Sequence, residues 1–301
     1  MSIIAELAQA EDLLSPGTSN CQGCAAELAL RTVLKTFGRK TIIGIPPGCM
    51  CGGGGGGWDG LSGLKIPCTV PLFDNVAGYM SGIKAAYRKI DPDVNVVGFA
   101  GDGATADIGL HCLSGAVERK NNIIYICYDN EGYMNTGFQK SGTTPAGAFT
   151  TTTPIGEKSN GKPGLKKDVA MMMAIQDAAY VATLSPAHTQ DFVRKLKKAL
   201  KVKDGLVYLH ILAPCPSGWG FDPSQSIRYA RLAVETRYFL LFEYQQGNFT
   251  ISNPTKNIKA AKDMEEFTRG QKRFKHLGEK VIQVVKDDAS RRWELLQKLA
   301  N

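Results

Sequence analysis

Several features are missing from this sequence of 301 residues. No apolar run approaches the roughly 18 to 20 residues that a membrane span needs. The first residues, MSIIAELAQAEDLL, place no basic residue ahead of an apolar core, so they lack the pattern of a signal peptide. Basic and aromatic residues are not interleaved, and no nucleic-acid-binding motif is present. We therefore expect a cytoplasmic protein that has neither a membrane nor a nucleic acid as its partner.

Apolar, β-branched runs alternate with amphipathic stretches along most of the chain. Residues 94–100 and 123–128 have the pattern of buried strands, and residues 106–120 between them have helical periodicity. Further strands are predicted at 41–45, 68–73, 180–183 and 206–212, and further helices at 25–37, 75–90, 168–176 and 189–202. This alternation indicates an α/β fold with a doubly wound, mostly parallel sheet. Beyond residue 221 the pattern changes, which predicts a C-terminal extension.

Glycines and oxygen ligands follow the two central strands. Gly101, Asp102 and Gly103 end the first strand, and Asn130 follows the second. Because adjacent parallel strands end at the same edge of a sheet, we expect the two turns to meet. The glycines allow a phosphate group to approach the backbone closely, and Asp102 and Asn130 supply hard oxygen ligands for a cation such as Mg²⁺. The alternative is a tight turn whose glycines are only structural.

The chain contains eight cysteines, and in a cytosolic protein of this size a disulfide framework is not expected. Cys112 and Cys127 lie in a predicted helix and a predicted buried strand, and are interpreted as core residues. Four others lie in loops or at a helix start near the same sheet edge: Cys21, Cys24, Cys49 and Cys215. Such thiols can bind an iron–sulfur cluster or a structural Zn²⁺, or they can be unligated. Cys51, two residues after Cys49, leaves the choice of the third ligand open.

These motifs together resemble a known family. The segments are CQGCAAELALR, PPGC, GDGATADIG, YDNEGYMNTGFQKSG, TTTTP and APCPSGW. In combination they resemble the thiamine diphosphate-binding β subunit of the 2-oxoacid:ferredoxin oxidoreductases, with the pyruvate enzymes as the closest branch. The resemblance extends from Cys21 to the RFKHL stretch near residue 277. It implies a thiamine diphosphate- and iron–sulfur-binding domain over residues 1–221, and an extension over 222–301 that packs on partner subunits.

The resemblance also implies roles for individual residues. The cofactor-binding residues would be Gly101, Asp102, Gly103, Asn130 and Gly132, of which Asp102, Asn130 and the Gly132 carbonyl would hold Mg²⁺. One [4Fe–4S] cluster would be ligated by Cys21, Cys24, Cys49 and Cys215, with Cys51 and Cys68 as non-ligands. Asn135 would lie near the reacting carbon as the catalytic residue. The carboxylate that activates the cofactor would come from a partner subunit.

The implied reaction is the oxidative decarboxylation of a small-molecule 2-oxoacid, with electrons passed through the cluster to ferredoxin. Implied partners are the other subunits of a hetero-oligomer, ferredoxin and, where an acyl group is transferred, coenzyme A. The Pro47-Gly48-Cys49 turn and the six glycines at 52–57 differ from the pattern of pyruvate enzymes. Pyruvate or another simple 2-oxoacid and oxalate therefore both stay as predicted substrates.

Three alternative functions come from other classes. The chain could be a non-catalytic iron–sulfur electron-transfer subunit, in which Gly101-Asp102-Gly103 is merely a turn. It could be a thiamine-dependent decarboxylase stabilised by zinc. A nucleic-acid-binding protein is indicated only by the net charge of +8.

Overall fold

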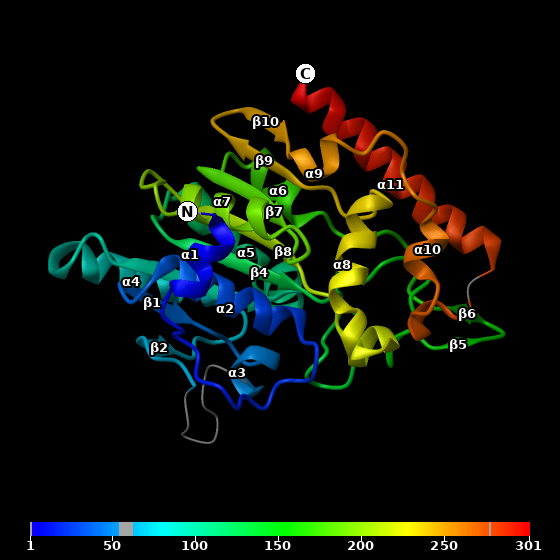
Figure 1. Cartoon of the computed structure of the whole chain (residues 1–301), viewed down its shortest axis with the longest axis horizontal. Helices are drawn as coiled ribbons and strands as arrows, with labels where there is room; N and C mark the ends of the chain where they lie inside the picture. The colour runs from blue at the N-terminus through cyan, green and yellow to red at the C-terminus, as the bar shows by residue number, and fades with distance from the viewer. Residues whose placement is uncertain (1, 54–62, 277) are drawn as a thin grey trace.

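A computed structural model describes residues 2–53, 63–276 and 278–301. Positions 54–57 of the predicted glycine run lie outside the described residues. The chain folds around an eight-stranded sheet with the order β10-β9-β7-β8-β4-β3-β1-β2 (Figure 1). Its strands are β1 (Thr41–Gly44), β2 (Cys68–Thr69), β3 (Asn95–Gly101), β4 (Ile124–Asp129), β7 (Tyr180–Leu184), β8 (Val207–Leu212), β9 (Phe242–Gln245) and β10 (Asn248–Ile251).

The sheet is parallel from β7 to β2 and antiparallel only where β9 joins β7 and β10 joins β9. Every residue of β4 and β8 is buried, as expected for central strands that helices cover on both faces. The predicted doubly wound, mostly parallel α/β sheet is confirmed. A separate two-stranded hairpin, β5 (Ile155–Gly156) and β6 (Ser159–Asn160), lies within the long loop that follows β4.

Helices cover both faces of this sheet. One apolar core lies between the sheet and helices α2 (Ala25–Phe37) and α7 (Thr189–Ala199). A second core lies on the other face, against α4 (Val76–Ile90), α5 (Leu110–Glu118), α6 (Val169–Ile175) and α11 (Glu279–Ala300). The short helices α1 (Ile3–Gln9) and α3 (Cys49–Gly53) flank the first layer. In the part of the chain that the structure describes, none of the helices combines the length and apolar character that crossing a bilayer requires.

Two predicted elements differ from those observed. The strand predicted over 68–73 is only Cys68–Thr69, because Pro71 lacks the backbone N–H that a longer strand would use. The helix predicted over 106–120 begins earlier, as a π-helical turn η1 (Gly103–Ile108), and continues as α5. The two join at Gly109, where a β-carbon would lie 2.1 Å from the carbonyl oxygen of Ala104. The chain therefore changes its winding at a position that has room only for glycine.

The C-terminal part of the chain is joined to the same sheet. It supplies β9 and β10 together with α8 (Ser226–Glu235), α9 (Asn253–Lys256), α10 (Met264–Thr268) and α11. A third apolar core unites Trp219 with Tyr238, Phe267 and Phe274 of this segment. The predicted boundary at residue 221 therefore crosses a continuous core. The packing of 222–301 on partner subunits stays a prediction.

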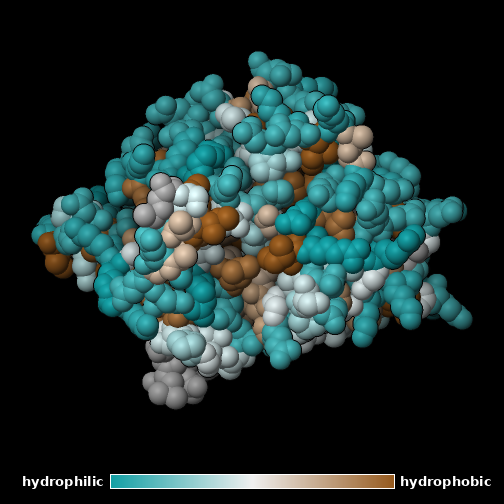
Figure 2. Space-filling view, viewed as in Figure 1, coloured by the Kyte–Doolittle hydropathy of each residue, from teal (hydrophilic) through white to brown (hydrophobic). Residues whose placement is uncertain are grey.

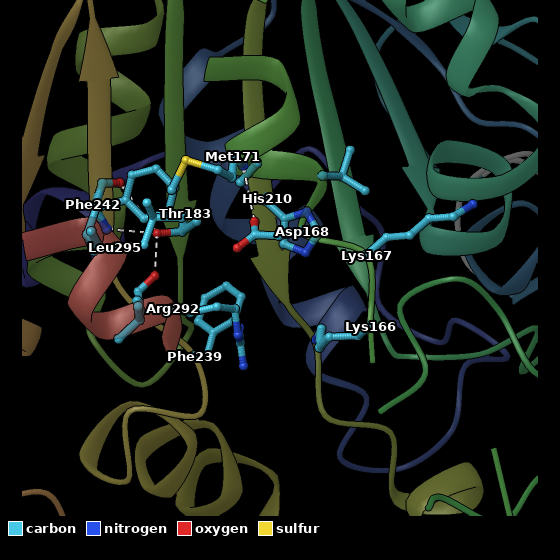
Figure 3. A pocket seen from close by; sticks show the side chains of 14 residues that line it. Lys166, Lys167, Asp168, Met171, Thr183, His210, Phe239, Phe242, Arg292 and Leu295 are labelled. Atoms are coloured by element: carbon cyan, nitrogen blue, oxygen red, sulfur yellow. Dashed lines mark hydrogen bonds between the residues drawn. The ribbon is translucent and has the colours of Figure 1, made fainter. Parts of the chain in front are cut away.

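Helix α11 lies across the edge of the sheet next to β9 and β10 (Figure 1). Arg292 of this helix donates to the carbonyl of Tyr238 over 3.0 Å. Thr183 of β7 donates to the carbonyl of Leu240 and accepts from the amide of Phe242 (Figure 3). The cavity that these groups enclose measures about 30 Å³, enough for a water molecule but not for a cofactor. Figure 2 shows a mostly hydrophilic surface on the viewed face, with apolar side chains gathered near its middle.

Candidate active site

Four of the predicted site loops follow the carboxyl ends of strands that are neighbours in the sheet, whereas Cys21 and Cys24 precede α2. Gly101 is the last residue of β3, Asn130 follows β4, Cys49 follows β1 and Cys215 follows β8. Because β8, β4, β3 and β1 are adjacent and parallel, their loops emerge at one edge. The convergence predicted from the alternation of strands and helices is therefore present.

A pocket of about 370 Å³ opens at this edge, a size typical of small-molecule sites. Its lining contains all the residues predicted to bind thiamine diphosphate and Mg²⁺, which are Gly101, Asp102, Gly103, Asn130 and Gly132. Asn135, the predicted catalytic residue, and Cys49 line the same pocket. Aromatic walls come from Phe73, Tyr128 and Tyr133. The structure brings these residues together, and their individual roles stay predictions.

Three polar groups converge on one point of the pocket. The amide atom of Asn130 that faces them lies 2.8 Å from the carbonyl oxygen of Gly132 and 3.0 Å from Oδ1 of Asp102. A nitrogen in this position donates to both oxygens, whereas an oxygen in this position requires a cation between the three groups. Octahedral Mg²⁺, with bonds of about 2.1 Å, holds neighbouring oxygens about 3 Å apart. The two distances from the Asn130 amide atom are therefore compatible with oxygens that share a Mg²⁺ ion.

The carboxyl group of Asp102 is almost completely buried and accepts hydrogen bonds from Ser141 and Thr143. Burial and the nearby carboxylate of Asp129 raise the pKa of Asp102 well above its usual value. The hydroxyl of Thr143 lies 2.8 Å from an oxygen of Asp102 and 2.8 Å from an oxygen of Asp129. This hydroxyl has one proton and donates to one carboxylate at a time; when Asp102 is protonated, the hydroxyl accepts from Asp102 and donates to Asp129, so that both contacts are hydrogen bonds.

The pKa of Asp129 is shifted in the opposite direction to that of Asp102, although both carboxyl groups are buried. Burial alone would raise its pKa, but Lys166 and the hydrogen bond from His210 outweigh burial and lower the pKa of Asp129 to about 2. His210 Nε2 lies 2.9 Å from Asp129 Oδ2, and Lys166 Nζ lies 3.6 Å from the same oxygen. Asp129 is thus the charged member of the pair. It also accepts the backbone N–H of Glu131, which orients the turn that carries Asn130.

The raised pKa of Asp102 predicts a pH dependence of Mg²⁺ binding. If Asp102 ligates Mg²⁺ as predicted, the metal must displace a proton wherever the pH lies below the raised pKa of Asp102, so binding there should release one proton. Below the raised pKa, the affinity for thiamine diphosphate with Mg²⁺ should increase by up to about tenfold per pH unit. Calorimetric titrations in two buffers of different ionisation enthalpy measure this proton, and equal heats in both buffers would contradict the prediction.

The raised pKa of Asp102 also predicts how the stability of the metal-free protein depends on pH. Folded Asp102 keeps its proton to a higher pH than Asp102 in the unfolded chain, whose pKa is about 4. The folded state therefore binds more protons between these two pKa values, and this contribution to stability is lost as the pH rises through that interval. Thermal unfolding with and without Mg²⁺ should show a stabilisation by the metal that increases with pH.

Glu131 holds the turn between Asn130 and Gly132 and was not predicted as a site residue. Its φ of 65° lies in the left-handed region, which only a few non-glycine residues adopt. Its carboxylate is fully buried and forms ion pairs with Lys166 Nζ at 2.6 Å and with Arg273 Nη1 at 2.7 Å. Tyr238 donates a further hydrogen bond. These contacts offset the free-energy cost of the left-handed backbone at Glu131, in the turn that carries the predicted metal ligands.

The four predicted cluster ligands lie close enough to affect one another electrostatically. Burial, with a smaller contribution from the charge of Cys215, raises the pKa of Cys24 to about 11 and that of Cys49 to about 12. Cys21 acts on Cys49 and on Cys215 in the same sense. Among residues 2–53, 63–276 and 278–301, no three His, Cys, Asp or Glu side chains gather as they would around a single metal ion.

The predicted non-ligand thiols interact with each other. Burial and, to a smaller extent, the charge of Cys51 raise the pKa of Cys68 to about 12. Cys51 and Cys68 are not among the largest contributions to the pKa shifts of Cys24 and Cys49 described above. The three largest charge contributions on Cys49 thus come from the other predicted ligands, whereas the one on Cys68 comes from Cys51.

Sequence reasoning missed the residues that support the site. Ser141 and Thr143 lie in the loop 130–168, whose length and lack of periodicity indicated function without indicating which residues act. Glu131 stands between two predicted ligands, but nothing in the local pattern shows that its carboxylate is buried. Lys166 and Arg273 are distant in sequence and resemble ordinary surface cations, so no local signal identifies them.

Comparison with known proteins places this arrangement in context. Residues 70–211 match the family model "Thiamine pyrophosphate enzyme, C-terminal TPP binding domain". The chain is 45% identical over 276 residues to the pyruvate synthase subunit PorB of Methanothermobacter thermautotrophicus, covering 89% of this chain and 92% of that protein. It is 43% identical over 296 residues to the ketoisovalerate oxidoreductase subunit VorB of Pyrococcus abyssi, covering 96% and 94%.

The fold is also found in a solved structure, the 2-oxoglutarate:ferredoxin oxidoreductase from Magnetococcus marinus with 2-oxoglutarate, coenzyme A and succinyl-CoA bound. The two chains superpose with a TM-score of 0.57 at 21% sequence identity, over 73% of this chain and 79% of the other. At this identity the similarity concerns the fold alone.

Proposed function

Because this chain belongs to the β subunits of the 2-oxoacid:ferredoxin oxidoreductases, we propose that it binds thiamine diphosphate with Mg²⁺ beside a [4Fe–4S] cluster. In a complex with partner subunits it would catalyse the oxidative decarboxylation of a small 2-oxoacid. The observation that carries the proposal is that Cys49 lines the same pocket as the converging groups of Asp102, Asn130 and Gly132. Oxygen ligands for a hard cation and a thiol for a redox cluster thus face one cavity.

The glycines suit the diphosphate end of the cofactor. A β-carbon on Gly103 would lie 2.6 Å from the ring of Tyr133, so a larger residue there would displace that wall. Asp102, Asn130 and the Gly132 carbonyl would hold Mg²⁺, and Thr143 and Glu131 support them from behind. When bound, thiamine diphosphate supplies an electron sink for loss of CO₂.

The pocket wall supports the proposed need for a partner subunit. Among the described lining residues, Asp102 provides the one carboxylate, and it is occupied by the proposed metal site. The carboxylate that activates the cofactor is therefore proposed to come from another subunit. Asn135 is exposed in the pocket and can donate or accept a hydrogen bond, which suits contact with the substrate.

The four thiols would hold the electron acceptor. Oxidative decarboxylation releases two electrons, which a cluster accepts one at a time and passes to ferredoxin. Pyruvate is the proposed substrate, with coenzyme A as the acyl acceptor, because relatives that align over most of their length are pyruvate synthase subunits. Ketoisovalerate and oxalate are alternatives that the same chemistry allows.

The test is an assay of the complex purified without oxygen together with its partner subunits. Pyruvate, ketoisovalerate, 2-oxoglutarate and oxalate are each supplied with a viologen dye, with and without coenzyme A. Dye reduction that depends on pyruvate and coenzyme A supports the proposal. Inactivity toward all four substrates would contradict it, and a complex that contains iron but binds no thiamine diphosphate would favour the non-catalytic electron carrier.

The cluster assignment predicts a specific loss of iron. Cys21→Ala should remove a ligand and lower the iron content by about four atoms per chain, together with the corresponding charge-transfer absorbance. Cys68→Ala is the matched control, because Cys68 is predicted as a non-ligand and this variant should keep the iron of the unmodified protein. Zinc in place of iron in the unmodified protein, or equal iron in both variants, would contradict the assignment.

A further inference from the structure

The turn that carries Cys215 also contacts the turn that carries Asn130. Cys215 precedes the π-helical turn η2 (Pro216–Gly220), and the N–H of Gly218 points at the Cys215 sulfur over 3.3 Å. One residue further on, the indole N–H of Trp219 donates to the carbonyl oxygen of Asn130 over 2.8 Å. This five-residue turn thus donates one hydrogen bond to the sulfur of a proposed cluster ligand and another to the backbone of a proposed metal ligand.

Trp219 has no freedom to move independently of these contacts. Its side chain is fully buried, and the guanidinium of Arg273 lies 3.7 Å above its ring. The same guanidinium binds the carboxylate of Glu131, the residue after Asn130. The edges of Phe221 and Phe267 pack against the indole from two further directions. The indole is therefore clamped between the cysteine turn and the metal turn.

A second contact joins the same two turns. A β-carbon on Gly218 would lie 2.1 Å from the sulfur of Met134, so the turns are packed without room for a larger residue. Met134 lines the proposed cofactor pocket next to Asn135. A shift of the Cys215 turn must therefore displace both the Asn130 peptide and the pocket wall.

We infer that Trp219 is a positioning residue that couples the two cofactor sites, so that cluster ligation and binding of thiamine diphosphate with Mg²⁺ strengthen each other. The inference rests on the proposed function and adds a reciprocal effect between its two halves. A bound cluster would fix the Cys215 turn, which through Trp219 orders the Asn130 turn before the second cofactor arrives. Since such coupling is reciprocal, bound thiamine diphosphate also stabilises the cluster.

The test is a double-mutant cycle on cofactor affinity, measured by calorimetry on the complex purified without oxygen. Trp219→Phe removes the indole N–H but keeps an aromatic ring, and Cys21→Ala removes a cluster ligand that does not line the cofactor pocket. Each single variant should raise the dissociation constant of thiamine diphosphate with Mg²⁺ about tenfold, as expected for a lost buried hydrogen bond in Trp219→Phe and for a typical coupling between two sites in Cys21→Ala. The double variant should also lose about tenfold rather than a hundredfold.

Trp293→Phe is the matched control, since Trp293 stacks on Arg237 and lies outside the pocket lining. It should leave the affinity unchanged. A hundredfold loss in the double variant, with iron absent as expected in Cys21→Ala, would overturn the coupling while leaving the proposed function intact. Retention of iron by Cys21→Ala would overturn both the coupling and the proposed cluster ligation by Cys21.

A comparison that needs no change at Trp219 keeps the inference testable if Trp219→Phe does not fold. The iron-free Cys21→Ala complex should bind thiamine diphosphate about tenfold more weakly than the unmodified complex. Equal affinities in these two proteins would overturn the coupling.

Discussion

Asp102→Asn should weaken the binding of thiamine diphosphate with Mg²⁺ by two to three orders of magnitude, since even the loss of an outer partner of a metal ligand costs about 10- to 100-fold. The substitution keeps the shape of the side chain and removes the charge that a divalent cation requires. Activity should fall with cofactor occupancy. Calorimetry with Mg²⁺ present measures the affinity, and activity at saturating cofactor tests whether binding accounts for the whole defect.

The same substitution should leave the fold intact. Burial and Asp129 disfavour the carboxylate form of Asp102, so in the metal-free protein a neutral amide avoids both this repulsion and the cost of taking up a proton at neutral pH. The unfolding temperature without Mg²⁺ should therefore be equal or higher at neutral pH. The control is Asp177→Asn, which should bind cofactor normally. The Asp177 carboxylate accepts a hydrogen bond from Tyr244 and lies outside the pocket lining. Normal affinity in Asp102→Asn would remove Asp102 from the metal site.

Arg273→Met should destabilise the fold by about 3 to 5 kcal/mol, the usual cost of breaking a buried ion pair from one side. Neither partner is exposed, and Lys166 alone would be left to balance Glu131 and part of the charge on Asp129. The loss should be visible as a lower midpoint of thermal or urea unfolding of the complex. Methionine keeps most of the volume of arginine, which limits the contribution of a cavity.

A second substitution separates the charge from the packing. Glu131→Gln combined with Arg273→Met removes the uncompensated charge and should recover part of the lost stability. Arg273→Lys should cost less than Arg273→Met because it keeps a charge, although it loses the planar group that stacks on Trp219. Stability of Arg273→Met equal to that of the unmodified protein would contradict the role assigned to this ion pair.

The sheet and the meeting of its loops were predictable because they depend on local patterns. Continuous apolar runs predict central strands such as β4 and β8, and the parallel topology then places their following loops at one edge. Gly101 and Gly103 at the end of β3 and Asn130 after β4 indicate a phosphate and cation site from the sequence alone. Gly109 shows the limit of this approach, because periodicity could not reveal that the helix starts with a π-helical turn.

The support of the site was not predictable for a different reason. Arg273 and Glu131 are 142 residues apart, and Lys166 and Glu131 are 35 residues apart. Nothing in the neighbourhood of an arginine or a lysine in a polar segment indicates that its charge will be buried. Tertiary packing alone creates these pairs.

The long separation between Glu131 and Arg273 has a consequence for synthesis on the ribosome. At roughly 5 to 20 residues per second, the translating ribosome needs on the order of ten seconds to add the intervening 142 residues. During this interval the nascent chain already contains β3 and β4, which precede the Asn130 turn, but Glu131 still lacks its arginine. The turn therefore reaches its final conformation late in synthesis, and acquisition of both cofactors should follow docking of the C-terminal segment.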